Sequence, residues 1–422
     1  MSDWEAVDQR EADQVKAKPR DMEQGATDQG MTDQGVTDEG VTDEGVIVVL
    51  GSANEDYVVR VGRRPSPGET VGEAVLDRMP GGKGANQAVA AARLGANVEI
   101  VAKVGTDSSG DLIAASLEES GVGCRWLYRT RQHPSGAAFI TVTPDGENTI
   151  VVAPGANAQL SVADVDAARA SLHGAAVVVM QLEIPVETVH HALEACGGDT
   201  LVVLNASPER HLDRRLLSRV DLVVVNQHEA AALVRRSGRV TGPQGRAGPP
   251  GEVPEVVADA AMAGGVVVRP AEAQGMAPVP AGPGEGRPAG TAARDPAVEE
   301  ATWDAVRICE KGPSATVVTL GPCGSVAAVR DTAPDGATSH WTCHVPAGAA
   351  PQVVDTTGAG DAFTGALVAW LVAAGTDRSS ASLRCRLCQG MEAAAAVAAV
   401  AVSRPGSQAS FPSRSEAGLP WA

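Results

Sequence analysis

The segment Asp355-Thr356-Thr357-Gly358-Ala359-Gly360-Asp361 stands between a strand-like approach and an apolar helix, and its residue types suit phosphoryl chemistry. Gly358 and Gly360 let backbone amides converge, and the following helix N-terminus adds partial positive charge, which together predict an anion hole. The carboxylate of Asp361 would accept a proton from a hydroxyl group held beside this hole. On these residues alone, an ordinary helix cap in a glycine-rich turn is an equally good interpretation.

A second glycine-rich stretch, Gly81-Gly82-Lys83-Gly84-Ala85-Asn86-Gln87, opens another helix-like segment. It lacks the Gly-Lys-Ser/Thr of a P-loop and the third glycine of a dinucleotide fingerprint, so both of these nucleotide sites are excluded. What remains is a turn that a polar ligand can approach closely, with Lys83 and Asn86 able to hydrogen-bond hydroxyl groups. A plain turn at the start of a helix is the alternative.

Polar side chains also follow strand-like segments, where ligands collect in parallel sheets. Asn54 and Asp56 are two residues apart, so in an extended chain both can face one side and hold neighbouring hydroxyls. Glu183 follows another strand-like run. Asn226 and Glu229 stand between a strand and a helix, where an amide and a carboxylate could hold magnesium-bound waters. A capped turn is the alternative interpretation at each of these places.

These candidates need a scaffold, and the chain alternates strand-like with helix-like segments from residue 46 onward. The strand-like runs are short and continuously apolar, as in parallel strands covered on both faces: Val46–Leu50, Val98–Val104, Ala175–Gln181, Leu201–Asn205, Leu222–Asn226 and Thr316–Leu320. The helix-like segments are mostly rich in alanine: Asn86–Leu94, Asp111–Ser120, Pro185–Cys196, Glu229–Arg236 and Ala362–Ala374. This alternation predicts an α/β fold with a doubly wound, mostly parallel sheet and helices on both faces.

Four further segments predict a small antiparallel sheet that forms a lid over the substrate end of the main sheet: Tyr57–Val61, Thr70–Leu76, Ala137–Thr143 and Asn148–Ala153. The middle two alternate apolar with small or polar residues, and Pro144-Asp145-Gly146 supplies a turn before the last. A lid with exposed edges often pairs with its twin, so we expect a homodimer.

Low-complexity segments flank and interrupt the predicted domain of residues 46–412. Residues 26–45 repeat a five-residue unit four times with one apolar residue in each, so residues 1–45 are predicted to be a disordered acidic tail. Residues 237–299 are rich in glycine, proline and alanine, which predicts a surface insertion without strands. Residues 413–422 are expected to form a C-terminal tail.

Charge and cysteine content exclude several partners. The chain carries 34 Lys and Arg against 52 Asp and Glu, a net charge of −18, which argues against binding to nucleic acid or an anionic membrane. The seven cysteines are scattered and no signal peptide opens the chain, so we expect a reducing, cytoplasmic compartment. Cys385 and Cys388 form a C-x-x-C pair without the two further ligands that zinc needs. The apolar run Ala393–Val402 is too short to cross a bilayer and predicts a buried helix.

With these motifs in order, the chain resembles the ribokinase family of sugar kinases, which also contains bacterial phosphofructokinase B and adenosine kinase. Both family signatures are present, at Gly81–Asn86 and at Asp355–Asp361, and the resemblance covers about residues 46–412 apart from the insertion. Five segments are similar to the kinases of ribose rather than to those of nucleosides or fructose: Gly51–Asp56, Pro67–Thr70, Gly82–Asn86, Gly155–Asn157 and Gln181–Glu183.

The resemblance implies ATP-dependent phosphorylation of D-ribose at the 5-hydroxyl, with Asp361 as the base and the amides of Gly358, Ala359 and Gly360 as the anion hole. It implies sugar contacts from Asn54, Glu55, Asp56, Gly82, Lys83, Gly84, Ala85, Asn86, Glu183 and Asp361. It implies an ATP site at Asn226, Thr319, Leu320, Gly321, Pro322, Cys323, Gly324, Gly360, Asp361 and Ala395. It also implies K⁺ at Asp355, Thr357, Ala401, Arg404, Gly406 and Ser410, and Mg²⁺ held through water by Glu229.

Two other functions stay open at this point. One is another sugar kinase of the same family, acting on deoxyribose or a keto-sugar, and the other is a catalytically silent sugar or nucleotide sensor. The chain departs from the family at Ala395, where histidine or asparagine usually meets the adenine edge. The resemblance implies a cytoplasmic location, with the nucleus as a second one.

Overall fold

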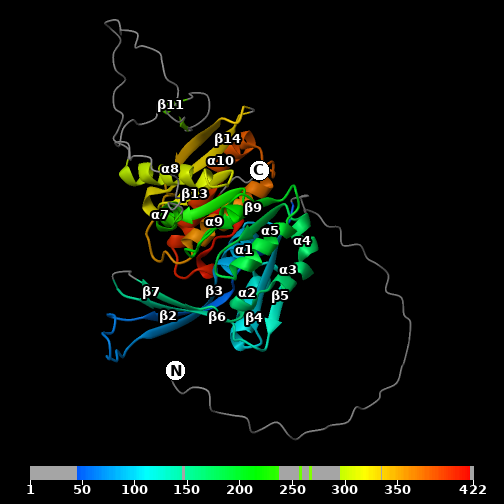
Figure 1. Ribbon diagram of the computed structural model, residues 1–422. Helices are drawn as coiled ribbons and strands as arrows, with labels where there is room; N and C mark the ends of the chain where they lie inside the picture. Colours follow the sequence, from blue (N-terminus) through cyan, green and yellow to red (C-terminus); the bar gives the residue numbers. More distant parts are fainter. Residues whose placement is uncertain are drawn as a thin grey trace, which may run out of the picture. The chain divides into compact units, whose positions relative to one another are not determined.

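The structure is a computed structural model that describes residues 45–144, 148–236, 256–258, 266–268, 295–333 and 335–418. The predicted acidic tail lies outside these residues except for Gly45, and most of the predicted insertion also lies outside them. The described chain from residue 45 onward is organised around two β-sheets of different size (Figure 1).

The larger sheet follows the order β11-β12-β15-β14-β13-β10-β9-β8-β1-β4-β5. Its strands are β1 (Ile47–Leu50), β4 (Val98–Gly105), β5 (Gly123–Thr130), β8 (Val177–Met180), β9 (Leu201–Asn205), β10 (Leu222–Asn226), β11 (Val256–Ala258), β12 (Val266–Val268), β13 (Ala315–Thr319), β14 (Ser325–Thr332) and β15 (Thr338–Val345). Neighbours from β13 to β5 are all parallel, and the strands beyond β13 pair antiparallel. All six strands expected from the apolar runs are confirmed.

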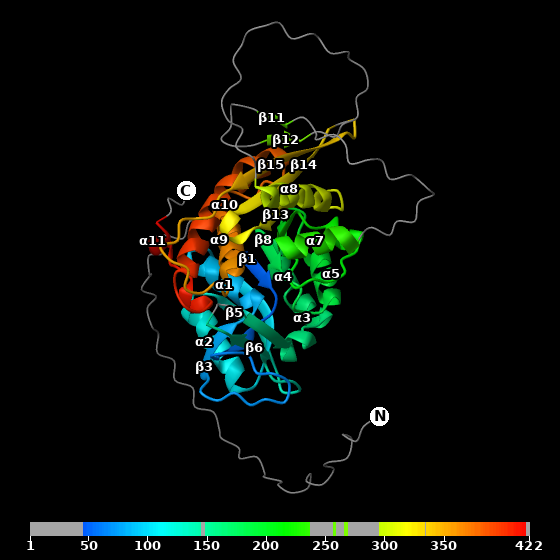
Figure 2. The ribbon, with the colours of Figure 1, turned by 90° about the vertical axis from the view of Figure 1, so that its left-hand side faces the viewer.

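Helices cover both faces of the large sheet (Figure 2). They are α1 (Lys83–Arg93), α2 (Ser108–Glu119), α3 (Val162–Ala167), α4 (Arg169–Gly174), α5 (Val186–Ala195), α6 (Arg214–Leu217), α7 (Gln227–Arg236), α8 (Pro296–Cys309), α9 (Ala359–Ala373), α10 (Ser380–Val402) and α11 (Arg414–Ala417). Ile47 and Val49 of β1 pack with α1, α2, α9 and α10, whereas Val48 and Leu50 pack with the layer from α3 to α8. Because alternate residues of β1 are buried on opposite faces, the predicted doubly wound fold is confirmed.

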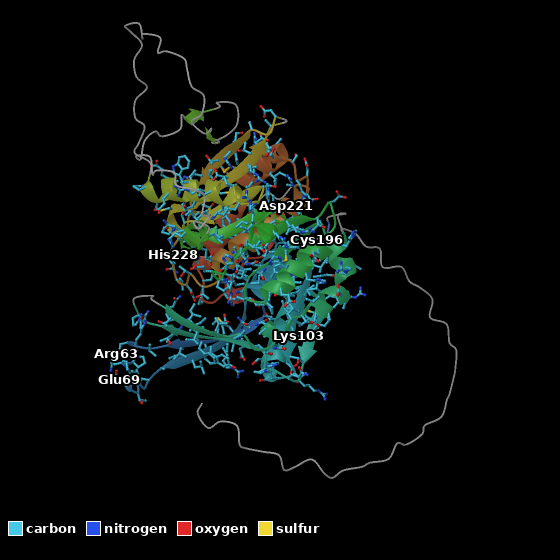
Figure 3. All side chains as sticks on the ribbon, in the orientation of Figure 1. Arg63, Glu69, Lys103, Cys196, Asp221 and His228 are labelled. Carbon is cyan, nitrogen blue, oxygen red and sulfur yellow. A yellow bond between two sulfur atoms is a disulfide. The ribbon has the colours of Figure 1, made fainter. Side chains whose placement is uncertain are left out.

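The smaller sheet has the order β3-β2-β6-β7 and projects from the body of the molecule (Figure 1). Its strands are β2 (Asn54–Arg60), β3 (Val75–Gly81), β6 (Gly136–Val142) and β7 (Asn148–Ala153). The prediction of a purely antiparallel sheet is wrong, because β2 and β6 are parallel while the two outer pairs are antiparallel. An ion pair between Arg63 and Glu69 lies in the loop at the outer tip of this sheet (Figure 3).

The strand predicted at Thr70–Leu76 is also wrong for most of its length. Residues 70–74 have no strand structure, and β3 runs instead from Val75 to Gly81, where Gly81 lies opposite Asn54 of β2. The alternation of apolar and polar residues predicted the strand a few residues too early in the chain. Pairing with β2 sets the position of β3, and the local sequence pattern does not. This pairing leads the chain from Gly81 directly into α1.

Part of the predicted insertion contributes to the large sheet. β12 pairs with β15, and β11 pairs with β12, so the expectation of no strands in this stretch is wrong for these six residues. The helix α8 begins at Pro296, before the predicted end of the insertion. The C-terminal tail begins with α11, which Arg404 holds through an ion pair of 2.9 Å to Glu416.

The helix α10 forms part of the core. By length and hydropathy it is long and apolar enough to span a membrane, but 56% of its most apolar window is buried inside the protein, as in a core helix. The expectation that Ala393–Val402 is a buried helix is therefore confirmed. Cys388 of α10 forms a disulfide with Cys343 of β15, a pairing that no sequence pattern indicated, and Cys385 is an exposed free thiol.

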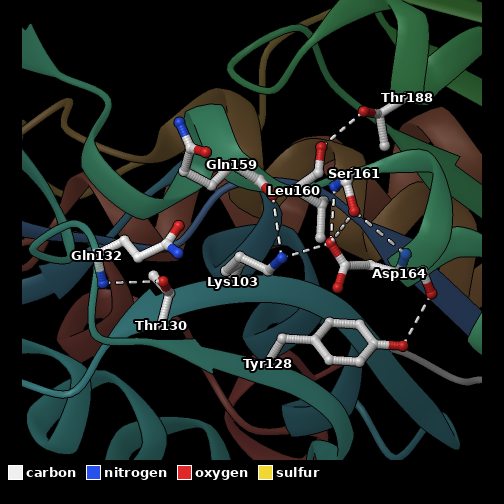
Figure 4. Close-up of polar contacts among 9 residues, drawn as sticks. All are labelled: Lys103, Tyr128, Thr130, Gln132, Gln159, Leu160, Ser161, Asp164 and Thr188. Carbon is white, nitrogen blue, oxygen red and sulfur yellow. Dashed lines mark hydrogen bonds and ion pairs between the residues drawn. The ribbon is translucent and has the colours of Figure 1, made fainter.

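A cluster of polar contacts anchors the short 3-10 helix Gly155–Gln159 against β4 and β5 (Figure 4). Lys103 donates from Nζ to the carbonyl of Gln159 at 3.0 Å and forms an ion pair with Asp164. The Tyr128 hydroxyl donates to the backbone carbonyl of Asp164 at 2.8 Å. These contacts fix the turn from which Asn157 reaches the residues that follow β1.

Candidate active site

A pocket of about 270 Å³ opens where the segments after β1 and β8 meet the small sheet. The polar side of this pocket contains most of the predicted sugar and catalytic residues: Asn54, Asp56, Gly82, Lys83, Asn86, Glu183, Gly358 and Asp361. Thr357, which was predicted for the monovalent cation, and Thr356, which was not predicted, also line it. The small sheet supplies the facing side: Ala138, Ile140, Asn148, Ile150 and Val152. Convergent polar groups at the carboxyl ends of parallel strands are typical of a site for a small polar ligand.

Asp361 lies in the first turn of α9 and is only 7% exposed. Its Oδ2 accepts a hydrogen bond from Nδ2 of Asn86 at 3.0 Å, and its Oδ1 accepts one from Nε2 of Gln87 at 2.9 Å. Two side chains of α1 therefore hold this carboxylate at the edge of the pocket. Asp361 faces the pocket and not bulk solvent. A general base needs this orientation to reach a bound hydroxyl.

A glycine lets α9 come close enough to α1 for these contacts. A Cβ atom added at Gly365, one turn after Asp361, would lie 2.5 Å from the Cβ of Ala90 and 2.8 Å from the carbonyl oxygen of Gln87. A larger residue would push the two helices apart, because real Cβ atoms do not approach this closely. The position of Asp361 therefore depends on close packing of two helices that are far apart in sequence.

The N-terminus of α9 begins in a left-handed turn. Gly358 caps the helix with a φ of 75°, and a Cβ there would lie 2.9 Å from the Cβ of Ser407. The N–H of Ala359 donates to the carbonyl of Thr356 at 3.2 Å, and a Cβ at Gly360 would meet no atom within 4 Å. Ala359 and Gly360 do not line the pocket, but the positive end of the helix dipole lies beside it and suits an anion.

Asn54 and Asp56 both face the pocket, as their spacing predicted. Oδ1 of Asn54 accepts a hydrogen bond from Nδ2 of Asn157 at 2.6 Å, which fixes the orientation of the Asn54 amide. Burial, followed by the carboxylates of Glu183 and Asp361, raises the pKa of Asp56 to about 7. In the ligand-free protein Asp56 therefore holds a proton below that pH, since burial and like charge both disfavour the ionised form.

Glu55 does not line the pocket, although a sugar contact was predicted for it. Its side chain is fully buried and accepts hydrogen bonds from Nε of Arg78 at 2.6 Å, from the hydroxyl of Tyr57 at 2.8 Å and from the hydroxyl of Ser109. Burial raises the pKa of Glu55, but these hydrogen bonds outweigh it and hold the pKa below the usual range. We correct its role to that of joining β2 to β3 and α2.

Glu183 enters the pocket from the loop after β8. Its Oε2 accepts hydrogen bonds from the hydroxyl of Ser52 at 2.6 Å and from the backbone N–H of Lys83 at 3.2 Å. Burial lowers the pKa of Lys83, but the surrounding carboxylates, led by Asp361 and Glu183, outweigh it and hold the pKa above the usual range. The pocket thus contains a charged ammonium group among carboxylates.

Gly84 and Ala85 do not line the pocket, although sugar contacts were predicted for both. A Cβ at Gly84 would lie 2.7 Å from the backbone nitrogen and oxygen of Ser52, and the N–H of Ala85 donates to the Ser52 carbonyl at 2.9 Å. Both residues therefore hold the start of α1 against the end of β1. Their backbone fixes where the neighbouring Lys83 and Asn86 enter the pocket.

Asn226 and Thr319, both predicted for the ATP site, lie opposite each other at the ends of β10 and β13. The N–H of Asn226 donates to Oε2 of Glu229, and the N–H of Glu229 donates to Oδ1 of Asn226, both at 2.9 Å. This is the reciprocal helix cap that the sequence left open as an alternative. Glu229 does not line the pocket, but its charge contributes to the raised pKa of Lys83.

The turn after β13 continues this edge of the site. It contains Leu320 and the 3-10 helix Gly321–Cys323, with Pro322 inside it, and ends at Gly324. A Cβ at Gly324 would lie 2.1 Å from the carbonyl oxygen of Val345, the last residue of β15. Gly348 lies three residues after Val345, and a Cβ there would lie 2.4 Å from the carbonyl oxygen of Ala395 in α10. The segment after β15 therefore packs against both the turn at Gly324 and Ala395.

The two segments predicted to hold a monovalent cation lie side by side. The carboxylate of Asp355 accepts hydrogen bonds from the N–H groups of Thr357 at 2.9 Å and Gly406 at 3.0 Å, and the N–H of Asp355 donates to the carbonyl of Val402 at 3.2 Å. The second segment also contains Ala401, Arg404 and Ser410. Among the residues whose positions the structure gives, no three His, Cys, Asp or Glu side chains gather as a metal site.

Three buried polar side chains around the pocket were not expected to act there. Ser52 holds Glu183, Asn157 holds Asn54, and Gln87 holds Asp361. Gln87 was the easiest to find from sequence, since a polar residue inside an alanine-rich buried helix is costly unless it is hydrogen-bonded.

The family model described as pfkB family carbohydrate kinase matches residues 46–268 and 292–414. The chain belongs to the pfkB family of carbohydrate kinases. Within the predicted insertion of residues 237–299, the family match leaves out only residues 269–291, so strands β11 and β12 lie inside the matched part.

Relatives within the pfkB family include kinases of two sugars. The ribokinase of Staphylococcus aureus is 39% identical over 189 residues, which are 44% of this chain and 62% of that protein. The deoxyribokinase of Salmonella typhimurium is 29% identical over 369 residues, 87% of this chain and 95% of that protein. The structure of Arabidopsis thaliana ribokinase complexed with ribose and ATP is 25% identical with a TM-score of 0.61, over 88% of this chain and 97% of that one. The match to the Staphylococcus aureus ribokinase therefore spans about three fifths of that relative's length.

Proposed function

We propose that this protein transfers the γ-phosphoryl group of ATP to the 5-hydroxyl of D-ribose. One observation carries the proposal: the buried carboxylate of Asp361 lies at the N-terminus of α9 and shares a pocket with Asn54, Asp56 and Glu183. A base, an anion-binding helix end and a set of polyol-binding groups are thereby brought together, as phosphoryl transfer to a sugar alcohol requires.

In the proposed reaction, Asp361 takes the proton of the 5-hydroxyl as the hydroxyl oxygen bonds to the γ-phosphorus. The bond between this phosphorus and the β–γ bridging oxygen breaks, and ADP leaves with the electron pair. The amides of Gly358, Ala359 and Gly360 stabilise the negative charge that spreads over the transferring group. Removing a positioned base of this kind usually costs about 10² to 10⁴ in rate.

Ribose would be held by the polar side of the pocket. We assign its hydroxyls to Asn54, Asp56, Asn86 and Glu183, with Gly82 allowing close approach of the backbone and Lys83 balancing the carboxylates. The small sheet faces these groups with the apolar side chains of Ile140, Ile150 and Val152, which exclude water from the reacting groups when the sugar is bound. The relatives named for ribose and deoxyribose support a pentose as substrate.

ATP would bind along the edge formed by Asn226, Thr319 and the turn Gly321–Gly324, with Ala395 beside the adenine. Mg²⁺ would come with the nucleotide and would neutralise charge on its phosphates, and Glu229 would hold the ion through water. A single carboxylate at the edge of the site fits Mg²⁺, because this ion usually keeps several of its waters and is held by one or two carboxylates, not by a closed cage of protein ligands.

We also assign a monovalent cation, K⁺, to the two adjacent segments that contain Asp355 and Gly406. A carboxylate next to backbone carbonyls is an oxygen donor set of the kind that hard cations prefer. Hydrogen bonds from Thr357 and Gly406 outweigh the effect of burial and hold the pKa of Asp355 below its usual range, so this carboxylate stays charged. A cation here would order the turn that carries Gly358, and so support the anion hole.

The small sheet also supports a homodimer. Three of its exposed apolar side chains, Leu76, Phe139 and Val151, lie on the face turned away from the pocket, because they alternate along the paired strands with the pocket-facing residues. A second copy placed on this face would cover them. We expect the protein to run as a dimer in size-exclusion chromatography with light scattering, and Val151→Asp to shift it toward the monomer. Val353→Asp, an equally exposed valine outside this sheet, is the matched control and should leave the dimer intact.

The test of the proposed function is ATP turnover with ribose, deoxyribose and fructose, each with and without potassium. We expect ribose to have the highest kcat/KM, potassium to raise it, and the product to carry phosphate at carbon 5 by NMR. A preference for deoxyribose would favour the second candidate, which the Salmonella typhimurium deoxyribokinase supports because 95% of its length is matched. No ADP release above the sugar-free rate with any sugar would indicate a sensor instead of a kinase.

A cytoplasmic location is part of the proposal. Five of the seven cysteines are free thiols, which suits a reducing compartment, and Cys343 and Cys388 form the disulfide described above.

A further inference from the structure

Gln87 is the buried polar residue of α1 that the proposed reaction does not use. Its side chain is fully buried and does not line the pocket. The two N–H groups of its amide reach two acceptors, Oδ1 of Asp361 at 2.9 Å and Oδ1 of Asn205 at 3.0 Å. Its own Oε1 accepts a hydrogen bond from Nε2 of Gln181 at 2.6 Å. Both hydrogens of the Gln87 side-chain amide therefore have an acceptor.

The neighbours of Gln87 fix which way its amide points. Nδ2 of Asn205 donates to the backbone carbonyl of Val224 at 3.0 Å, so Oδ1 of Asn205 is the atom that faces Gln87. Both Asn205 Oδ1 and the Asp361 carboxylate are acceptors, and only the NH₂ end of the amide satisfies them. A flipped Gln87 would put its oxygen against a carboxylate, so the donor is held in place before any ligand binds.

We propose that Gln87 is a positioning residue for phosphoryl transfer, which holds the carboxylate of Asp361 in one orientation and stabilises its ionised form. This inference rests on the proposed function, since it assumes that Asp361 is the base. Hydrogen bonds to a carboxylate from a buried amide favour the charged form and oppose rotation of the side chain. Gln181 and Asn205 act one step further out, by setting the orientation of Gln87.

Other charged groups also act on Asp361, and the test has to separate them from Gln87. The charge of Asp361 interacts with Lys83 of α1 and with Asp56 of β2, and the carboxylate of Glu183, from the loop after β8, lies in the same pocket. All three line the pocket and would contact the sugar, whereas Gln87 does not. A change at Gln87 should therefore alter kcat and its pH dependence, and leave the KM for ribose nearly unchanged.

The test compares the pH profile of kcat for Gln87→Met and Gln87→Glu with that of the wild type. Gln87→Met keeps the length of the side chain and removes the donor. We expect kcat to fall about tenfold and the acid limb to move up by about one pH unit, with the KM for ribose within about twofold. In Gln87→Glu a second carboxylate faces Asp361, so the acid limb should move further in the same direction.

Thr188→Val is the matched control, because Thr188 is buried and its hydroxyl donates to the Leu160 carbonyl at 2.7 Å, away from the pocket. It should lower stability without moving the acid limb. An unchanged acid limb in both Gln87 variants overturns the inference, and so does loss of folding in both while Thr188→Val folds, because Gln87 would then be structural only.

A second measurement separates this inference from the proposed function. The side-chain carboxyl ¹³C signal of Asp361, assigned as the one missing from Asp361→Asn, should titrate at higher pH in Gln87→Met than in the wild type. This shift does not depend on turnover. A shifted signal in a protein that phosphorylates no sugar would uphold the contact and refute the kinase. An active wild type with no shifted signal would refute the role of Gln87 alone.

Discussion

Replacing Asp56 with asparagine should stabilise the ligand-free protein, and by more at pH 8 than at pH 5. Burial, then the charges of Glu183 and Asp361, raises the pKa of Asp56 from 3.8 to about 7. In the unfolded chain this carboxyl ionises near pH 4. Between these values the folded protein keeps a proton that the unfolded chain has lost, so the free energy of unfolding falls as the pH rises through this window and levels off above it.

The size of the effect follows from the shift of about three pKa units. At about 1.36 kcal/mol per unit, the raised pKa of Asp56 lowers the free energy of unfolding by about 4 kcal/mol at pH 8 and by about 1.5 kcal/mol at pH 5, relative to a carboxyl with an unshifted pKa. Asparagine does not titrate, so its advantage over Asp56 should grow by about 2.5 kcal/mol between these two pH values. For a chain of this size, that corresponds to about 3 °C in Tm.

The assay is thermal or urea unfolding without sugar, at pH 5, 6, 7 and 8. Asp77→Asn is the control, because Asp77 lies on the same small sheet but outside the pocket, with its side chain 46% exposed and paired with Arg60. Ribose should stabilise the wild type more at pH 8 than at pH 6, since its hydroxyls donate to the ionised carboxylate of Asp56. A difference between Asp56→Asn and the wild type that does not grow from pH 5 to pH 8 would refute the reasoning.

Two further substitutions test other parts of the pocket. Gly358→Ala should lower kcat by about tenfold or more, because the added Cβ at a φ of 75° would lie 2.9 Å from the Cβ of Ser407 and displace the helix N-terminus; wild-type turnover in this variant would contradict an anion hole at this turn. Glu183→Gln should raise the KM for ribose by about tenfold with a smaller change in kcat, as expected for a sugar ligand held by Ser52. An unchanged KM would remove Glu183 from the sugar site.

The sequence predicts the large sheet well because its signals are local. The runs at Leu201–Asn205 and Leu222–Asn226 coincide with β9 and β10, since a strand buried on both faces is apolar along its whole length. The spacing of Asn54 and Asp56 likewise predicts that both face the pocket, because side chains alternate in an extended chain. The glycines around Asp361 indicate the turn at the start of α9.

Other features depend on contacts between distant segments, and no local pattern carries them. The position of β3 is set by pairing with β2, and the parallel pairing of β2 with β6 needs a crossover that alternation does not indicate. Alternation along β2 already places Glu55 on the face opposite Asn54 and Asp56, but its partners there, Arg78 and Ser109, come from distant segments. The bond from Gln87 to Asp361 joins residues 274 positions apart, and it forms only because Gly365 lets α9 pack closely on α1.

The base assigned to Asp361 is tested most directly by Asp361→Asn, with kcat from ADP release and the affinity for ribose from calorimetry on the same protein. Asparagine keeps the shape of the side chain and its place between Asn86 and Gln87, but it cannot take a proton. We expect kcat to fall by about 10² to 10⁴ while the Kd for ribose stays within about threefold. A variant that binds ribose and turns over at the wild-type rate would contradict the assignment.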